Sequence, residues 1–277
     1  EIKMIKPSVT LSLIAPYGEP FLRPQIKEPW PDLVIAAGRK TIPYLRYIKK
    51  TSKTVCKTIY LQDPKIDSKE FDIVWAPTYD AIDGDNVIKT VTSPNRVTDQ
   101  LLNTQHSEWL KILSKLKGPF VGFLIGGKSK AFSFNNKDCE KILTALSNVI
   151  NKGYTPLITM SRRSPKILSD RIRDLLGNKN NLFYDGNGPN PYFAILKVSE
   201  VIIATPDSAN MISETLNVPK PLYYIDLKSN SKRFNKFINI LRNSGHIRPF
   251  KNNIELFDNK KLDPTQEIVD YISKNLF

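Results

Sequence analysis

The sequence has only two cysteines and two histidines among its 277 residues. Cys56 and Cys139 lie far apart in the chain, so neither a disulfide framework nor a cysteine-based metal site is indicated. His106 and His246 have no metal-ligand spacing with an acidic residue. We therefore predict no metal site, and we expect a cytoplasmic protein in a reducing compartment.

Long hydrophobic runs are also missing. No apolar stretch approaches the ~18 residues of a transmembrane helix, and no signal peptide is recognisable. The longest runs, such as Phe120–Ile125 and Val201–Ala204, have the length of strands. Hydrophobic residues make up 40% of the chain and charged residues 25%, which is ordinary for a globular protein. A chain of this length forms one large domain or two moderate ones.

The net charge of +14 reflects basic residues that are dispersed rather than clustered. Acidic residues are interleaved with the lysines, and the densest basic segment is Arg46–Lys57. No zinc-finger spacing, basic zipper or aromatic RNA-binding motif accompanies the charge. We interpret it as a solvated basic surface and predict no nucleic-acid partner.

Apolar strand-length runs alternate with helical patterns along most of the chain. Residues 1–30 are proline-rich and irregular, after which the alternation predicts a parallel sheet with helices on both faces. The predicted strands cover residues 32–38, 54–61, 71–75, 86–91, 120–125, 155–160, 182–184, 201–204 and 221–225. The predicted helices cover residues 39–48, 100–116, 138–151, 165–176, 191–198, 208–216, 234–244 and 265–275. The pattern restarts at Gly118, so we predict two Rossmann-like domains, residues 1–117 and 118–277, with the last helix packing back on the first domain.

Polar, cationic or glycine-bearing loops follow four consecutive strands of the second domain. Ligands of open parallel sheets bind at the carboxyl ends of the strands, and paired glycines let backbone N–H groups approach an anion. Arginine binds phosphate with parallel hydrogen bonds. These loops therefore predict a site for a phosphate-bearing ligand, with the candidate residues Gly126, Gly127, Lys128, Ser129, Ser161, Arg162, Arg163, Asn190, Asp207, Ser208 and Glu214.

One stretch imitates the phosphate loop of nucleoside triphosphatases. Gly122 to Ser129 fits the pattern Gly-x-x-x-x-Gly-Lys-Ser. In that motif the variable residues form a loop, whereas Phe123, Leu124 and Ile125 have the character of a buried strand. The following helix should also begin at once, yet residues 131–136 intervene. We therefore reject the triphosphatase interpretation and keep anion binding for Gly126–Ser129.

Several motifs, in order along the chain, resemble the mitochondrial-fission family known from the plant elongated-mitochondria protein and its bacterial relatives. They are Asp32–Arg39, Leu61–Pro64, Phe71–Pro77, Leu124–Gly127, Gly188–Tyr192, Thr205–Ser208 with Ser213-Glu214, and Arg233 through Arg248-Pro249. The resemblance runs from about Pro31 to Phe250. It implies a glycosyltransferase-B-like fold, an α/β architecture in which two Rossmann-like domains face a cleft.

The resemblance also implies site residues and a ligand. The Ser208–Glu214 region would meet the ribose of a nucleotide, and the Gly126–Ser129 loop its phosphates. Gly38, Arg39 and Arg248 are further cleft candidates. The expected ligand is a nucleotide-sugar or another phosphorylated small molecule, taken as a substrate rather than as a cofactor. Family members usually open with a strand and a glycine loop that this sequence lacks, so we expect the first domain to be truncated at its N-terminus.

The residues leave the activity open. Where many relatives have His-Asp, this chain has Tyr79-Asp80; a tyrosine with an ordinary pKa of about 10 is a poor general base at neutral pH. Asp80 is the one candidate for that role, and a loop-capping carboxylate is the plainer interpretation. Three classes remain: transfer of a sugar from a nucleotide, non-catalytic binding or recruitment at the inner face of a membrane, and nucleoside-diphosphate-sugar epimerisation. The missing Gly-x-Gly-x-x-Gly fingerprint argues against the epimerase.

Overall fold

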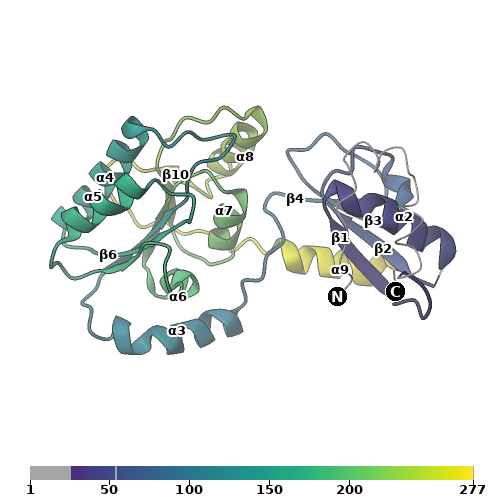
Figure 1. The fold of residues 1–277 in the computed structure, drawn as a ribbon, viewed down its shortest axis with the longest axis horizontal. Coiled ribbons are helices and arrows are strands. Elements are labelled where there is room, and N and C mark those ends of the chain that lie inside the picture. The colour runs from purple at the N-terminus through teal and green to yellow at the C-terminus, as the bar shows by residue number, and fades with distance from the viewer. Residues whose placement is uncertain (1–25, 54, 277) are drawn as a thin grey trace. The chain divides into compact units, whose positions relative to one another are not determined.

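The computed structural model describes residues 26–53 and 55–276 (Figure 1). Most of the predicted irregular segment, residues 1–25, lies outside the described residues. The chain forms two compact units, each with its own parallel sheet. Unit 1 comprises the described residues up to Thr90 and the C-terminal residues from Gln266, and unit 2 comprises Val91–Thr265.

The division between the units lies at Thr90–Val91, whereas the sequence predicted it at Gly118. Hydrogen bonds explain the difference. The Ser93 N–H donates to Ser213 Oγ at 2.9 Å, and the Asn95 N–H donates to Thr265 Oγ1 at 3.0 Å. The helix that follows, α3 (Asp99–Leu113), packs along a helix of unit 2. Residues 91–117 therefore belong to unit 2, contrary to the predicted range 1–117 for the first domain.

Unit 1 is a four-stranded parallel sheet in the order β1-β2-β3-β4. Its strands are β1 (Leu33–Ala37), β2 (Lys57–Leu61), β3 (Ile73–Pro77) and β4 (Val87–Thr90). The helix α2 (Ile42–Thr51) has apolar residues at helical spacing and buries Ile42 and Leu45 against Tyr60, Phe71 and Val74. The C-terminal helix α9 (Pro264–Leu276) clusters with this unit from Gln266 onward, and Tyr271 Oη donates to the Asp85 carbonyl at 2.9 Å.

Unit 2 is a six-stranded parallel sheet in the order β10-β9-β8-β5-β6-β7. Its strands are β5 (Phe120–Ile125), β6 (Thr155–Met160), β7 (Leu182–Tyr184), β8 (Val201–Ala204), β9 (Leu222–Tyr224) and β10 (Arg248–Pro249). The helices between them are α4 (Asn136–Asn151), α5 (Lys166–Leu176), α6 (Tyr192–Val198), α7 (Ala209–Leu216) and α8 (Lys232–Asn243). The order is that of a doubly wound Rossmann sheet, with its switch point between β5 and β8.

The two faces of this sheet are covered by different helices (Figure 1). Alternate residues of a strand point to opposite faces, and Val121, Phe123 and Ile125 of β5 pack in one core with α4 and α5. On the other face a Cβ on Gly122 would lie 2.9 Å from Ile195 Cγ2 of α6. Helix α6 therefore lies directly on β5, and α3 packs on the outside of α6.

The strand–helix alternation predicted for the chain is present, with three kinds of difference. Helix ends shift by a few residues, and α4 begins at Asn136 because Asn135 and Asp138 form a reciprocal capping box. The two-residue strand β10 was missed. The short helix Ser68–Glu70 was also missed, because three residues carry no periodicity. Residues Arg39–Thr41, predicted as the start of the helix over 39–48, form a short separate helix before α2.

Candidate functional site

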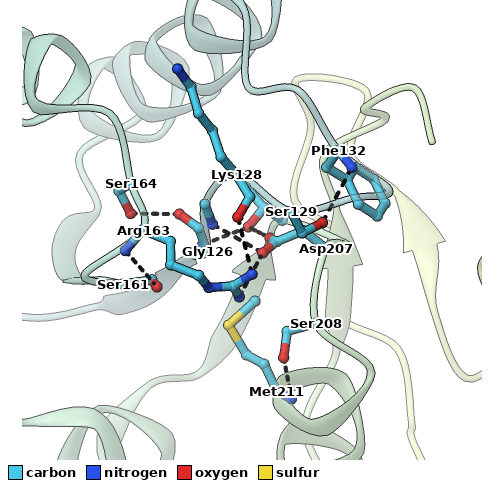
Figure 2. Close-up of polar contacts among 12 residues, drawn as sticks. Gly126, Lys128, Ser129, Phe132, Ser161, Arg163, Ser164, Asp207, Ser208 and Met211 are labelled. Atoms are coloured by element: carbon cyan, nitrogen blue, oxygen red, sulfur yellow. Dashed lines mark hydrogen bonds and ion pairs between the residues drawn. The ribbon is translucent and has the colours of Figure 1, made fainter. Parts of the chain in front are cut away.

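Three polar loops meet at the switch point of the unit 2 sheet (Figure 2). They follow β5, β6 and β8, and their central residues are Gly126–Ser129, Ser161–Ser164 and Thr205–Ser208. Parallel strands end at the same edge of a sheet, which is why loops that lie far apart in the sequence come together here. The structure thus brings together most of the residues predicted to bind phosphate.

Asp207 is the centre of this loop cluster. Its side chain is fully buried. Its Oδ2 accepts from the Gly127 N–H at 3.0 Å, and its Oδ1 accepts from Thr205 Oγ1 at 2.6 Å. Thr205 Oγ1 in turn accepts from the Gly126 N–H at 2.8 Å. Burial raises the pKa of Asp207, while these hydrogen bonds and the charge of Arg163 act in the opposite direction. Asp207 therefore links the loops from a buried position, away from solvent.

The paired glycines are required by close packing. A Cβ on Gly126 would lie 2.0 Å from Asp207 Oδ1, and a Cβ on Gly127 would lie 2.2 Å from the Arg163 carbonyl carbon. Both distances are far below any van der Waals contact. Only glycine fits at either position, for a reason that involves no phosphate.

The backbone N–H groups of this loop already have acceptors in the protein. Besides Gly126 and Gly127, the Lys128 N–H donates to the Arg163 carbonyl at 3.1 Å and the Ser129 N–H to the Phe132 carbonyl at 3.0 Å. The predicted use of these N–H groups as phosphate donors is therefore corrected. What the loop offers a ligand is the exposed side chain of Lys128, which extends away from Asp207 (Figure 2).

The loop after β6 brings a guanidinium to the cluster. Arg163 Nη2 lies 3.6 Å from Asp207 Oδ2, its Nη1 donates to the Lys128 carbonyl at 3.2 Å, and half of its side chain remains exposed. Ser161 Oγ accepts from the Arg163 N–H, and Ser164 Oγ donates to the Gly126 carbonyl at 2.5 Å. Arg162 is exposed. The Arg163 side chain thus contacts the buried Asp207 carboxylate and is also partly exposed to solvent (Figure 2).

Helix α7 leads from this cluster to a cavity. Ser208 caps the helix, because its Oγ accepts from the Met211 N–H at 3.3 Å. The helix buries Ile212, Ser213 and Leu216 and leaves Glu214 partly exposed. Glu214 lies six positions after Ser208, which corresponds to about 9 Å along a helix axis.

The cavity next to Glu214 has a volume of about 440 Å³, within the usual range for small-molecule sites. Asn190, Tyr192 and Phe193 line it from the start of α6, and Arg96, Leu101 and Gln105 line it from the segment before α3 and from α3 itself. The Arg96 guanidinium stacks on the Phe193 ring at 5.1 Å, and the Tyr192 and Phe193 rings meet edge to face. The cavity therefore combines aromatic walls with one cation and one carboxylate.

Glu214 and Tyr192 are coupled inside this cavity. Burial raises the pKa of Glu214, and a hydrogen bond with Tyr192 and the charge of Arg96 lower it in part. Burial and the neighbouring Glu214 raise the pKa of Tyr192 well above its ordinary value. Asn190 Oδ1 accepts from the Tyr192 N–H at 3.0 Å and from Thr159 Oγ1 at 3.1 Å, which fixes the start of α6. Glu214 and Asn190 are the two predicted site residues that line the cavity.

Sequence reasoning missed the cavity residues Arg96, Gln105, Tyr192 and Phe193. The first two precede Gly118 and were assigned to the other domain. The two aromatics fall in the predicted helix over residues 191–198, and the motif Gly188–Tyr192, which contains Tyr192, was a usable signal.

The remaining predicted residues lie elsewhere. Gly38, Arg39 and Asp80 belong to unit 1; Gly38 has a positive φ of 88° before a short helix, and the Asp80 N–H donates to the Pro77 carbonyl at 2.9 Å. Arg248 stacks on Phe257 at 4.0 Å, outside both the loop cluster and the cavity. β5 continues through Ile125 and the next helix begins at Asn136, which confirms that Gly122–Ser129 is not a triphosphatase loop.

Residues 26–53 and 55–276 contain no group of three or more histidine, cysteine or acidic side chains that could hold a metal ion. Within the same residues, no helix is both long enough and apolar enough to cross a membrane.

Comparison with known proteins gives matches at the level of sequence and of fold. The sequence model of the family described as Mitochondrial fission ELM1 matches residues 2–276. An uncharacterised protein, RP120, of Rickettsia prowazekii is 26% identical over 86% of this chain and 77% of its own length. The mitochondrial fission protein ELM1 of Arabidopsis thaliana is 24% identical over 79% of this chain, and the match spans 57% of that protein.

Among solved structures, the UDP-GlcNAc 2-epimerase of Methanocaldococcus jannaschii superposes with a TM-score of 0.58 at 14% identity. The superposition covers 96% of this chain and 81% of the epimerase. At that identity the likeness shows the fold alone. It confirms the predicted glycosyltransferase-B-like α/β fold with two parallel sheets.

Proposed function

The chain belongs to the Mitochondrial fission ELM1 family and has a glycosyltransferase-B-like fold, and from this premise we propose that unit 2 binds a nucleotide-sugar. The proposal rests on one observation: the cavity of about 440 Å³ that contains Glu214 is connected by α7 to the loop cluster at the switch point. The UDP-GlcNAc 2-epimerase with a similar fold is, by its name, an enzyme of a UDP-sugar, which supports the same ligand class.

The ribose belongs at Glu214. A carboxylate has two oxygens that accept hydrogen bonds, and a ribose presents adjacent hydroxyl donors. Glu214 is only partly exposed and faces the cavity, so its hydrogen bonds to a ligand form away from bulk water. The aromatic side chains of Tyr192 and Phe193 offer flat apolar surface to a base in the same cavity.

The diphosphate belongs at the other end of α7. The first N–H groups of a helix carry a partial positive charge that favours anions. Arg163 and Lys128 add two full charges at the same edge of the sheet, and both side chains reach solvent. Side chains and the start of α7 therefore take the role that the sequence had assigned to the backbone of Gly126–Ser129.

The reaction that fits this ligand class is transfer of the sugar to an acceptor. Asp80, the candidate for a general base, is a partly exposed residue of unit 1. An epimerase reaction is the second candidate, because a UDP-GlcNAc 2-epimerase has a similar fold.

A thermal-shift screen of the full chain tests the proposal. Ligands that bind only the folded state raise its stability by mass action, by about 2.7 kcal/mol at a hundred-fold excess over Kd. We expect UDP- or other nucleoside-diphosphate-sugars to raise the melting temperature, and free sugars to leave it unchanged. Release of the nucleotide from a bound nucleotide-sugar in the presence of acceptors would then identify transfer. A screen in which no nucleotide shifts the melting temperature would refute the proposal and favour non-catalytic recruitment.

A further inference from the structure

Asn95 is the centre of a hydrogen-bond network in unit 2. Its N–H donates to Thr265 Oγ1 at 3.0 Å, and Thr265 Oγ1 donates to the Asn95 carbonyl at 2.8 Å. Its Oδ1 accepts from the Val97 N–H at 3.0 Å and from Asn217 Nδ2 at 3.1 Å, and its Nδ2 donates to the Ser93 carbonyl at 3.2 Å. All the polar groups of Asn95 therefore have a partner inside the protein.

Helix α7 anchors the same stretch of chain. The Ser93 N–H donates to Ser213 Oγ at 2.9 Å, and Asn217, which holds the Asn95 side chain, is the residue that ends α7. Both anchors on this helix, Ser213 and Asn217, are buried. Glu214 lies between them in the sequence. The stretch around Asn95 is therefore fixed to the part of α7 that carries Glu214.

The network also includes the place where the chain leaves unit 2. The chain enters this unit at Val91 and leaves it at Thr265, and α9 clusters with unit 1 from Gln266 onward. Just before α9, the Leu262 N–H donates to the Leu216 carbonyl of α7 at 2.8 Å. Both segments that connect the units are thus hydrogen-bonded to α7 or to each other within unit 2.

Arg96 is the residue of this stretch that lines the cavity, together with Glu214. Its guanidinium stacks on the Phe193 ring at 5.1 Å. Among the residues that the structure describes, none forms a hydrogen bond or an ion pair with this guanidinium. An arginine side chain has many rotamers. The position of the Arg96 backbone therefore decides which part of the cavity the guanidinium can reach.

We propose that Asn95 and Thr265 are positioning residues of the nucleotide site, because they hold the backbone of Arg96 where its guanidinium can bind the nucleotide. The inference rests on the proposed function. A guanidinium has five N–H donors and no acceptor, so it binds oxygen atoms of the ligand. Thr265 is not among the residues that line the cavity and acts through Asn95. Without the network, only the fraction of molecules with Arg96 in place binds with full affinity.

Calorimetry of the full chain with UDP, GDP, ADP and CDP tests the network. Thr265→Val keeps the shape of the side chain but removes the hydroxyl that contacts Asn95. We expect the Kd of each nucleotide that binds the parent to rise by about threefold to tenfold, the usual effect of one lost hydrogen bond. Asn217→Ala removes another bond of the network and should act in the same direction. Thr265→Ser keeps the hydroxyl and should bind like the parent.

Thr155→Val is the matched control for stability. Thr155 Oγ1 accepts from Asn180 Nδ2 at 2.8 Å and donates to the Lys117 carbonyl, so this hydroxyl also has one donor and one acceptor as partners. Thr155 begins β6, whereas the loops of the proposed site follow the ends of the strands. Thr155→Val should lower the melting temperature without changing the Kd. Circular dichroism verifies that each variant is folded.

A double-mutant cycle with Arg96→Gln separates positioning from a general loss of stability. In the Arg96→Gln protein, Thr265→Val should change the Kd by less than about twofold, because the side chain that the network positions is already absent. An unchanged Kd in Thr265→Val, equal rises with and without Arg96, or the same rise in Thr155→Val would overturn the inference and leave the proposed function standing. No binding of any of the four nucleotides by the parent would refute the proposed function and this inference with it.

Discussion

The loop cluster around Asp207 and the cavity around Glu214 lie at opposite ends of the same short helix, and each contains a carboxylate whose pKa is raised by burial. They differ in the hydrogen-bond partners and the exposure of the carboxylate. Asp207 is fully buried and accepts hydrogen bonds from Thr205 and Gly127, whereas Glu214 is partly exposed and lines a cavity. Polar residues at a switch point can therefore stabilise the fold, and the carboxylate proposed to bind a ligand is the one that lines a cavity.

Removal of the Asp207 carboxylate should have the largest effect. Asp207→Ala leaves the Gly127 N–H and the Thr205 hydroxyl without their acceptor inside the protein, and each unsatisfied buried group costs about 1–3 kcal/mol. We expect the free energy of unfolding, measured with urea, to fall by about 3 kcal/mol or more. Asp207→Asn keeps one acceptor oxygen and should lose less. An Asp207→Ala protein as stable as the parent would show that the cluster does not hold the loops together.

Glu214→Ala should produce the opposite pattern. We expect nucleotide binding to weaken by about 1.5–3 kcal/mol, the usual cost of hydrogen bonds to a charged group, with little change in the melting temperature. Isothermal titration calorimetry with a nucleoside diphosphate measures the loss. The control Glu200→Ala removes an exposed carboxylate that is not part of the cavity lining. Unchanged affinity in a folded Glu214→Ala protein would remove this residue from the site.

Arg163 contacts the buried Asp207 and also reaches solvent, so its replacement should affect both the stability of the protein and ligand binding. Its pairing with Asp207 is long, at 3.6 Å, and half exposed, so Arg163→Gln should cost less than about 1 kcal/mol of stability. Loss of the Arg163 guanidinium should weaken the binding of a nucleoside diphosphate by about 1.5 kcal/mol, because a charge-assisted hydrogen bond to the phosphates is removed. The nucleoside without phosphates should bind both proteins equally. Equal losses for nucleoside and diphosphate in the same titrations would place Arg163 away from the phosphates.

Lys220 is a third charged group whose pKa is shifted by burial, and it is not among the residues that line the cavity or form the loop cluster. Burial lowers its pKa to about 8, although its Nζ donates to the carbonyls of Lys197 and Ser199. Between pH 8 and its unfolded value of about 10.4 the unfolded chain holds more protons, so the free energy of unfolding should rise with pH there. The gain is on the order of 1 kcal/mol, since the group is partly exposed.

The pH series for Lys220 needs a matched variant. In urea denaturation, Lys220→Met should remove the rise in the free energy of unfolding between pH 8 and about 10.4. The affinity for a nucleotide should stay unchanged. Parallel curves for parent and variant across the whole window would contradict the lowered pKa.

Many of the residues predicted for the site lie together in the structure, because the sequence carries a signal for the loops that follow its strands. The strand-end loops were found from glycines and cations that follow apolar runs, as at Gly126-Gly127 and Arg162-Arg163. Their roles could not be found in the same way. The acceptor of the Gly127 N–H is Asp207, eighty positions away, and only the pairing of β5 with β8 brings the two together.

By itself, the sequence determined the alternation of strands and helices, the parallel sheets and the set of loops at their carboxyl ends, because these depend on local periodicity and on the turn residues that interrupt it. Tertiary structure decided the rest. Helix α3 belongs to unit 2 because it packs on α6. The N–H groups of Gly126 and Gly127 donate to acceptors within the protein. Arg96 and Glu214 line the same cavity. Such pairings depend on the distances between residues in space, and no local pattern of the chain encodes them.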